Sequence, residues 1–342
     1  MSATATATRT VRAERPVSRV ETFMSRHAAM TPSFAAVVIL ALLLVGAEAF
    51  LRGDFVTART LSALLLDNAY LLILAVGMTF VILTGGIDLS VGSVMAFTGI
   101  LGSQLLAAGV PVWVAVPAML AGGSAIGLLI GVLVQYFNVQ PFIASLAGLF
   151  LARGLAFVVS LSSIRVEQPA VLWLQQNRIR LGDWYVTPTG ILALLIVALA
   201  AFVLHLTRFG RTVYAIGGSE QSARLMGLGV ARTKVTVYVI SGFCGGLAGL
   251  VLTAYSGAGY PRNGIGTELD AIAAVVIGGT LLTGGRGYVL GSLIGVLVFG
   301  TIKTIISFMG AEQSWMQIIV GGLLLLFIVV QRVIVARSEH RR

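Results

Sequence analysis

An aspartate lies in a stretch of sequence that is otherwise apolar. Asp88 falls in the segment 85–90, GGIDLS, and no Asp, Glu, Lys, Arg or His follows it before Arg153. The intervening residues are enough helix to cross a ~30 Å hydrocarbon core about three times. A carboxylate at that depth is costly unless it faces water, protein or backbone donors at a helix end. Glycine-interrupted segments at membrane depth mainly line cavities or are buried in protein, so this segment indicates the working part of a transporter subunit.

The chain shows no motif for bond chemistry. It lacks a Gly-x-x-x-x-Gly-Lys-Ser/Thr loop, so we do not expect it to bind ATP by itself. The three histidines (His27, His205, His340) are scattered, and the single cysteine, Cys244, has no neighbour with metal-ligand spacing. There is no nucleophile elbow. We therefore expect no catalytic residue, no metal site and no cofactor in this chain.

The composition is that of a membrane protein. Hydrophobic residues make up 57% of the 342 residues, charged residues 11%, and the mean hydropathy is +0.97. A soluble domain carries about 25% charged residues. The net charge of +10 arises largely from Lys and Arg in three segments, namely 1–30, 207–234 and the residues after 331. Positive charge beside membrane spans marks the cytoplasmic side, which explains the excess better than a nucleic-acid partner does.

Apolar windows predict an all-α, polytopic fold with about ten crossings, of which the third and eighth are short or re-entrant. The windows are 33–50, 62–84, 91–109, 112–135, 141–161, 189–206, 235–255, 268–284, 288–308 and 315–334. Eight or nine full crossings with a re-entrant piece are the alternative. The predicted organisation is a disordered cytoplasmic tail (1–30), a transmembrane domain (31–336) and a short cytoplasmic tail (337–342). Ten crossings from a cytoplasmic N-terminus put the basic loop 207–234 inside.

The long loop 162–187 then falls outside the membrane. It contains Trp173 and Trp184 among charged and apolar residues. Two interpretations are open for it: an amphipathic helix lying in the interface with its Trp residues at headgroup level, or a packed external cap.

Small residues recur at helical spacing. Three rows of glycines, each four residues apart, predict close helix packing, within one subunit rather than across a dimer: Gly123, Gly127 and Gly131; Gly245 and Gly249; Gly291 and Gly295. A weak internal echo is also present, because the segments 84–86 and 283–285 are both Thr-Gly-Gly and each is followed by a Gly-Ser pair. Corresponding interrupted helices are common in transporters built from repeats.

The basic loop contains a second candidate site. Ser219 is a predicted N-cap, Glu220 suits a first helical turn, and Gly227 or Gly229 can end the helix. Ala223 and Gly227 are four residues apart, which predicts a small helical face that another protein could approach closely. The alternative is a solvated cytoplasmic loop.

Four segments in order resemble one family. They are GMTFVILTGGIDLSVGS, NVQPFIASLAGLFLARG, AIGGSEQSARLMGLGV and ELDAIAAVVIGGTLLTGGRG. From about residue 60 to 333 the chain resembles the permease subunits of bacterial ribose/xylose-type (CUT2-like) sugar ABC importers, and it is most similar to a permease of a galactofuranose importer.

The resemblance implies a ten-span importer permease fold in the bacterial inner membrane. It implies an ABC ATPase partner that holds ATP and Mg, a periplasmic sugar-binding protein, and a second permease, identical or different, in the lipid bilayer. The cargo would be a monosaccharide such as galactofuranose or another pentose or hexose, and the resemblance does not identify which.

The resemblance also assigns residues. It implies ATPase coupling by Glu220, Ala223 and Gly227, although Glu220 lies one residue farther from Gly227 than in the best-known coupling signature, which leaves its role open. It implies a translocation path or helix break in the segment that contains Gly85, Gly86, Asp88 and Ser90. Three charged residues are further candidates for the path, because Arg153 lies alone in the fifth predicted span and Glu268 and Asp270 open the eighth.

Two interpretations are open for each charged residue among these candidates. Asp88 caps a helix N-terminus or contacts a sugar hydroxyl, and Arg153 pairs with an acid or extends to an interface. Glu268 and Asp270 are gate residues or acids of a first helical turn.

Two other functional classes are compatible with a polytopic chain. An ion-coupled secondary sugar transporter would normally carry intramembrane acid/base relays, and here only Asp88 and Arg153 are well embedded. A membrane scaffold or enzyme using the external loop would need a catalytic constellation, which the sequence lacks. The sequence therefore favours the importer permease.

Overall fold

The computed structural model of the protein describes residues 31–50 and 55–310, and beyond them 315, 317–322, 325, 326 and 329. The predicted tails, 1–30 and 337–342, lie outside the described residues, as does much of the predicted last span, 315–334. Where it is described, the chain is mostly helical, as the sequence predicts.

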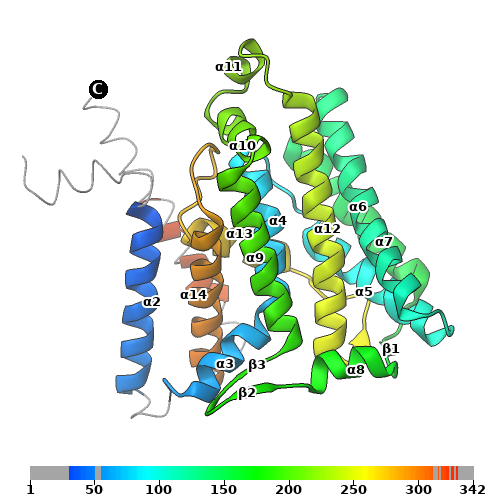
Figure 1. The fold of residues 1–342 in the computed structure, drawn as a ribbon, viewed down its shortest axis with the longest axis vertical. Helices are drawn as coiled ribbons and strands as arrows, with labels where there is room; N and C mark the ends of the chain where they lie inside the picture. Colours follow the sequence, from blue (N-terminus) through cyan, green and yellow to red (C-terminus); the bar gives the residue numbers. More distant parts are fainter. Residues whose placement is uncertain are drawn as a thin grey trace, which may run out of the picture.

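The longest helices correspond to predicted spans and run side by side (Figure 1). They are α2 (Thr31–Phe50), α6 (Val112–Tyr136), α7 (Pro141–Val159), α9 (Pro188–Leu206), α12 (Val230–Ser256) and α14 (Val289–Phe308). Local sequence sets their ends. At the start of α9, for example, the Thr187 side chain accepts the Gly190 N–H, and Pro188 occupies the first turn.

Five of the described helices, α6, α7, α9, α12 and α14, are long and apolar enough to cross a membrane. A sixth span results if α3 (Ala58–Asp67) and α4 (Ala69–Leu83) are counted together, but this pair is bent by 53°. The bend falls at Asn68, whose side chain donates to the Leu64 carbonyl at 2.8 Å. The predicted continuous span 62–84 is therefore a broken helix.

The prediction of ten full crossings is not confirmed in the described part of the chain. Helix α5 (Val91–Ala107) has 17 residues and rises about 26 Å, whereas α13 (Thr267–Ile277) has 11 residues and rises about 16 Å. Helix α13 falls well short of a ~30 Å core, whereas α5 lies at the lower limit of the length that a span needs. They are the third and eighth windows, which the sequence indicated as short or re-entrant. Most of α5 is buried in protein, and apolarity alone does not distinguish protein-facing from lipid-facing helices.

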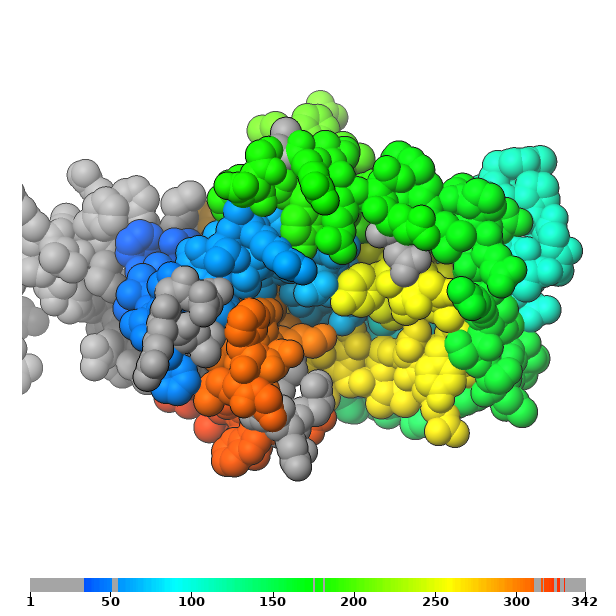
Figure 2. Space-filling model, turned by 90° about the horizontal axis from the view of Figure 1, so that it is seen from below, coloured from blue at the N-terminus to red at the C-terminus, as the bar shows by residue number. Residues whose placement is uncertain are grey.

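The two ends of the helix bundle carry different short helices. At one end lie α10 (Arg208–Gly218) and α11 (Glu220–Leu225), which form the basic loop, and at the other lie α3 and α8 (Pro169–Gln176) (Figure 1). Seen from below in Figure 2, blue α3, green residues around α8 and α9, and the yellow end of α12 share this second face.

The all-α prediction needs one correction, because the chain also forms two small antiparallel sheets. Strand β1 (Ile164–Arg165) pairs with β4 (Ala258–Gly259), and β2 (Ile179–Leu181) pairs with β3 (Trp184–Val186). The hairpin turn begins with Gly182 at φ +67°, a conformation that glycine adopts without strain. A Gly-Asp pair between apolar residues is a hairpin signal that span-based reasoning overlooked.

The loop 162–187 is packed onto the bundle. Val166 and Val171 are buried with Leu106, Ala115 and Ala254, so the structure supports the packed cap. Trp173 and Trp184 remain about half exposed, at 55% and 49%. The helical part of the loop is only the eight residues of α8.

Helix α12 is the centre of the bundle, and it contacts α4, α5 and α6. A Cβ atom added at Gly127 would contact the Tyr238 carbonyl oxygen, and one added at Gly123 would contact the Gly242 carbonyl oxygen. In turn, a Cβ at Gly242 would contact the Gly123 carbonyl. Packing of this glycine row within one subunit is confirmed.

The other two glycine rows also pack within the chain. Gly245 and Gly249 lie against Val94 and Thr98 of α5, whereas Gly295 lies against the Ala274 carbonyl of α13. Backbones approach closely at all three places, which is the way helices associate when apolar burial gives no advantage over lipid.

We predict that Gly127→Ala lowers the stability of the protein by about 1–3 kcal/mol, because the added methyl group forces α6 away from α12. The measurement is the thermal unfolding midpoint in detergent. The matched control is Gly154→Ala on α7, where an added Cβ meets nothing within 4 Å. Equal midpoints for the two variants would contradict the packing role.

Candidate functional site

Asp88 is buried at the start of α5 and is fully hydrogen-bonded. Its side chain is 1% exposed. One carboxylate oxygen, Oδ1, accepts the Ser90 N–H at 2.9 Å and the Ser90 hydroxyl at 2.6 Å. The other, Oδ2, accepts the Ser241 hydroxyl of α12 at 2.7 Å. Asp88 thus joins the helix break to the central helix, and these donors offset part of the cost of burying its charge.

The two glycines before Asp88 have different roles. Gly85 has φ +79°, the left-handed conformation that ends α4. A Cβ at Gly86 would lie 2.6 Å from the Tyr238 hydroxyl oxygen, so glycine leaves room for that hydroxyl. Among the described residues the Tyr238 hydroxyl is buried without a hydrogen-bond partner. Ser241 and Tyr238, one turn apart on α12, complete the site and were missed in the sequence, because their distance from Asp88 along the chain gives no local signal.

Arg153 and Glu268 lie near one another, and Glu268 lies against the first turn of α5. The Arg153 guanidinium donates to the carbonyls of Pro261 and Asn263, both at 2.7 Å. Glu268 is close enough to interact with Arg153 electrostatically, and a Cβ at Gly92 would contact the Glu268 carboxylate. The structure therefore brings together Arg153 and Glu268, two charged positions that are far apart in the sequence. The hydrogen bonds of Arg153 to backbone carbonyls were not part of either interpretation, which were pairing with an acid and extension to an interface.

Glu268 and Asp270 are both in the first turn of α13. The Glu268 carboxylate accepts the Gly266 N–H at 3.2 Å, as expected for an acid at a helix start. Asp270 has additional electrostatic neighbours, namely Lys303 of α14 and Tyr70 of α4. A gating role for either acid stays a prediction.

The segment α10–α11 has a well-defined local fold. The Ser219 hydroxyl accepts the Ser222 N–H at 3.2 Å, which confirms Ser219 as the N-cap of α11. After α11 the chain turns at Gly227, φ +74°. The Gly227 N–H donates to the Arg224 carbonyl and the Leu228 N–H to the Ala223 carbonyl. This pair of bonds is a Schellman motif, so Gly227 ends the helix as the sequence predicts.

The predicted small face of Ala223 and Gly227 does not form. The Ala223 side chain is fully buried against Ile216 and Val230, and Gly227 lies beyond the last residue of α11. Spacing of four residues places two side chains on one face only while the helix continues. The exposed tip of the segment is instead apolar, because Leu225 is 83% exposed and Met226 is 66% exposed.

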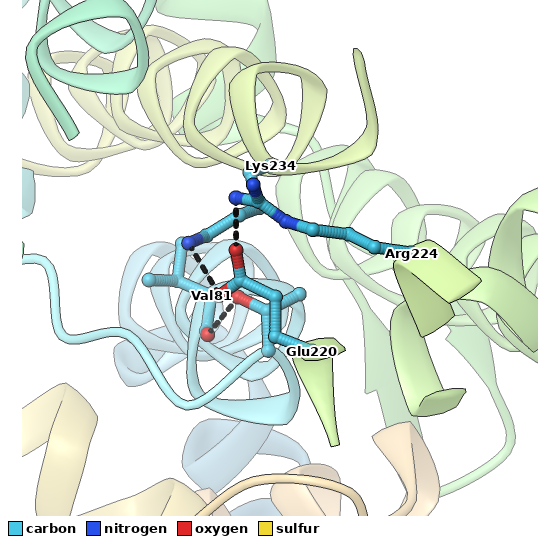
Figure 3. A network of polar contacts seen from close by, with 5 residues as sticks. Val81, Glu220, Arg224 and Lys234 are labelled. Carbon is cyan, nitrogen blue, oxygen red and sulfur yellow. Dashed lines mark hydrogen bonds and ion pairs between the residues drawn. The ribbon is translucent and has the colours of Figure 1, made fainter. Parts of the chain in front are cut away.

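Glu220 holds this segment together from within the chain. Its carboxylate forms ion pairs with Arg224 at 2.6 Å and with Lys234 of α12 at 2.8 Å (Figure 3). Partial burial raises the pKa of Glu220, but the two cations outweigh it and hold the pKa below its ordinary value. Glu220 is therefore ionised at neutral pH, and it fastens α11 to the start of α12.

An open pocket of about 420 Å³ lies beside this ion-pair network. Its lining includes Gln135 at the end of α6, Arg224 and Arg232. Arg224, which lines the pocket, immediately precedes the apolar tip residues Leu225 and Met226.

The chain combines helices that are long and apolar enough to cross a membrane with a buried helix break, whose carboxylate is fully hydrogen-bonded. This combination is typical of multi-pass membrane transport components. The chain belongs to the family described as "Branched-chain amino acid transport system / permease component", whose profile matches residues 60–329.

Individual relatives are similar over most of their length. The "Fructose import permease protein FruG" of Bifidobacterium longum (strain NCC 2705) is 45% identical over 92% of this chain and 94% of its own. The "Inner membrane ABC transporter permease protein YjfF" of Escherichia coli (strain K12) is 45% identical over 84% and 88%. The "Ribose import permease protein RbsC" of the same strain is 39% identical over 86% and 92%. No solved structure matches the chain.

We predict that Asp88→Asn folds nearly as well as the wild type, because an amide keeps the shape and the serine hydroxyls can reorient toward it. Asp88→Leu leaves the Ser90 N–H and two hydroxyls without an acceptor, at about 1–3 kcal/mol for each buried group. Folded yield and unfolding midpoint in detergent measure the difference. If the Leu variant were as stable as the Asn variant, the hydrogen bonds of Asp88 would not hold the break.

Proposed function

We propose that this chain is a permease subunit of an ATP-driven importer that moves a monosaccharide across the bacterial inner membrane. The observation that carries the proposal is the similarity, over 84–92% of the chain, to relatives named as fructose and ribose import permeases and as an inner membrane ABC transporter permease. The buried helix break supports it, since interrupted helices at membrane depth occur where solutes pass.

The proposed ATPase surface is the α10–α11 end, on the cytoplasmic side. Exposed apolar residues next to cationic ones are typical of a surface that another protein covers, and here Leu225 and Met226 follow Arg224. The ATPase would hold ATP and Mg. Ala223 contributes from inside by anchoring α11, and Gly227 by turning the chain after it.

The remaining partners follow from the same proposal. A periplasmic sugar-binding protein would dock at the opposite end, around α3, α8 and the β2–β3 hairpin. A second permease, identical or different, would complete the path through the lipid bilayer. In such a path Asp88, Arg153 and Glu268 position the helices that open and close it, and direct sugar contact by Asp88 is less favoured because both its oxygens already accept protein donors.

An ion-coupled secondary transporter is the other candidate. Such a protein needs buried groups that exchange a proton or cation as the path alternates. Asp88 is held by three donors within the protein, and Arg153 is occupied by two backbone carbonyls. Neither arrangement favours ion exchange.

We predict that Leu225→Asp prevents co-purification of the ATPase, because a charge replaces the most exposed apolar side chain of the tip. A carboxylate that is buried in an interface without a partner is strongly unfavourable. Leu225→Met, which keeps an apolar side chain, is the matched control and should retain the partner. Full co-purification and uptake with both Leu225→Asp and Met226→Asp would show that the ATPase docks elsewhere.

The experiment that tests the proposed function is reconstitution in vesicles. The purified chain alone should neither hydrolyse ATP nor concentrate sugar, because it has no nucleotide-binding loop. With the ATPase, the binding protein and any second permease, uptake should require ATP and persist when proton and sodium gradients are collapsed. Accumulation driven by a gradient in the lone chain would replace this proposal with the secondary transporter.

A further inference from the structure

The last turn of α10 lies directly against two helix breaks at once. A Cβ atom added at Gly217 would contact the Leu83 carbonyl oxygen at the end of α4 and the Gly285 amide nitrogen before α14. It would also lie 2.9 Å from the Gly285 Cα. Gly217 is thus packed backbone to backbone, and no flexible side chain stands between α10 and either break.

The two breaks also contact one another. The Gly285 N–H donates to the Leu83 carbonyl at 2.9 Å, and a Cβ at Gly284 would lie 2.8 Å from the Gly85 nitrogen and 3.1 Å from the Gly217 Cα. These are the two Thr-Gly-Gly segments, 84–86 and 283–285, that echo one another in the sequence. One break leads into α5 and the Asp88 cluster, and the other leads into α14.

The rest of α10 is fastened to the same elements. The Phe209 ring lies 6.3 Å from Phe80 of α4, centroid to centroid. The Tyr214 hydroxyl donates to the Gly287 carbonyl at 2.7 Å. Burial, together with the neighbouring Tyr288, raises the pKa of Tyr214 to about 12, so this donor keeps its proton at any physiological pH. A displacement of α10 must therefore displace both breaks.

A continuous connection also runs from α10 to the exposed tip. Ile216 of α10 packs on Ala223 of α11 and on Val230, and Glu220 joins α11 to Lys234. A displacement of Leu225 and Met226 would therefore be transmitted to Gly217 through these packed and ion-paired residues.

We propose that Gly217 is the positioning residue that couples the ATPase surface to both helix breaks. One movement of α10 would then shift the end of α4 and the segment that leads into α14 together. The inference rests on the proposed function, which supplies the ATPase. It also gives a role to the contact between the two glycine breaks, because Gly217 packs against the backbone of both. Rigid elements with close-packed backbones transmit displacement because packed interfaces do not deform continuously.

The chain provides a matched pair of variants for the test. Gly217→Ala adds a methyl group against Leu83 and Gly285, whereas Gly218→Ala adds the same group on the same helix where nothing lies within 4 Å. Each variant is assembled with the ATPase, binding protein and any second permease, and the sugar imported per ATP hydrolysed is measured alongside the unfolding midpoint.

With Gly217→Ala we expect ATPase binding and ATP hydrolysis to persist. The sugar imported per ATP should fall about tenfold, a change of the size that coupling between two distant sites typically produces. With Gly218→Ala we expect the wild-type ratio. A merely structural role would lower the midpoint or the yield of the complex and leave the ratio unchanged. A wild-type ratio in Gly217→Ala, or the same loss in both variants, would overturn the inference.

Tyr214→Phe keeps the test decisive if Gly217→Ala does not assemble. It removes only the hydroxyl that holds the Gly287 carbonyl, and it should lower the ratio with assembly intact. A wild-type ratio in that variant would also overturn the inference. Failure of the wild-type complex to import sugar with ATP would instead refute the proposed function itself.

Discussion

Close contact between backbones, made possible by glycine, is the interaction on which the rest of the structure depends. A helix in lipid gains little by burying apolar side chains, since the surrounding tails are equally apolar, so helices associate through tight packing. The chain has 41 glycines, and the row 123, 127 and 131 brings α6 onto α12 at Tyr238 and Gly242. Helix α12 is thereby fixed as the centre against which α4, α5 and α6 are placed.

The same central helix makes a buried charge tolerable. Ser241 of α12 supplies one of the three donors of Asp88, and Gly86 is small enough to leave room for Tyr238 one turn away. The break before α5 is therefore a defined structure rather than a loose connection. Its rigidity follows from the cost of leaving a buried carboxylate or its donors unpaired.

The α10–α11 end is stabilised in a different way, by caps and ion pairs characteristic of helices in water. Ser219 and Gly227 define the two ends of α11, and Glu220 draws Arg224 and Lys234 together. With Ala223 turned inward, the residues left outward are Leu225 and Met226. Gly217 then joins this polar end to the glycine breaks, so two regions with different physical chemistry share one backbone contact.

The sequence by itself determined the membrane class, most of the long helices, the cap at Ser219, the stop at Gly227 and the glycine rows, because each depends on residues within a few turns. The tertiary structure decided that most of α5 is buried in protein, that Ala223 faces inward, and that Ser241 and Tyr238 complete the Asp88 site. It also decided that the echoing segments 84–86 and 283–285 meet at Gly217. These features depend on contacts between residues far apart in the chain, for which periodicity and local propensity carry no information.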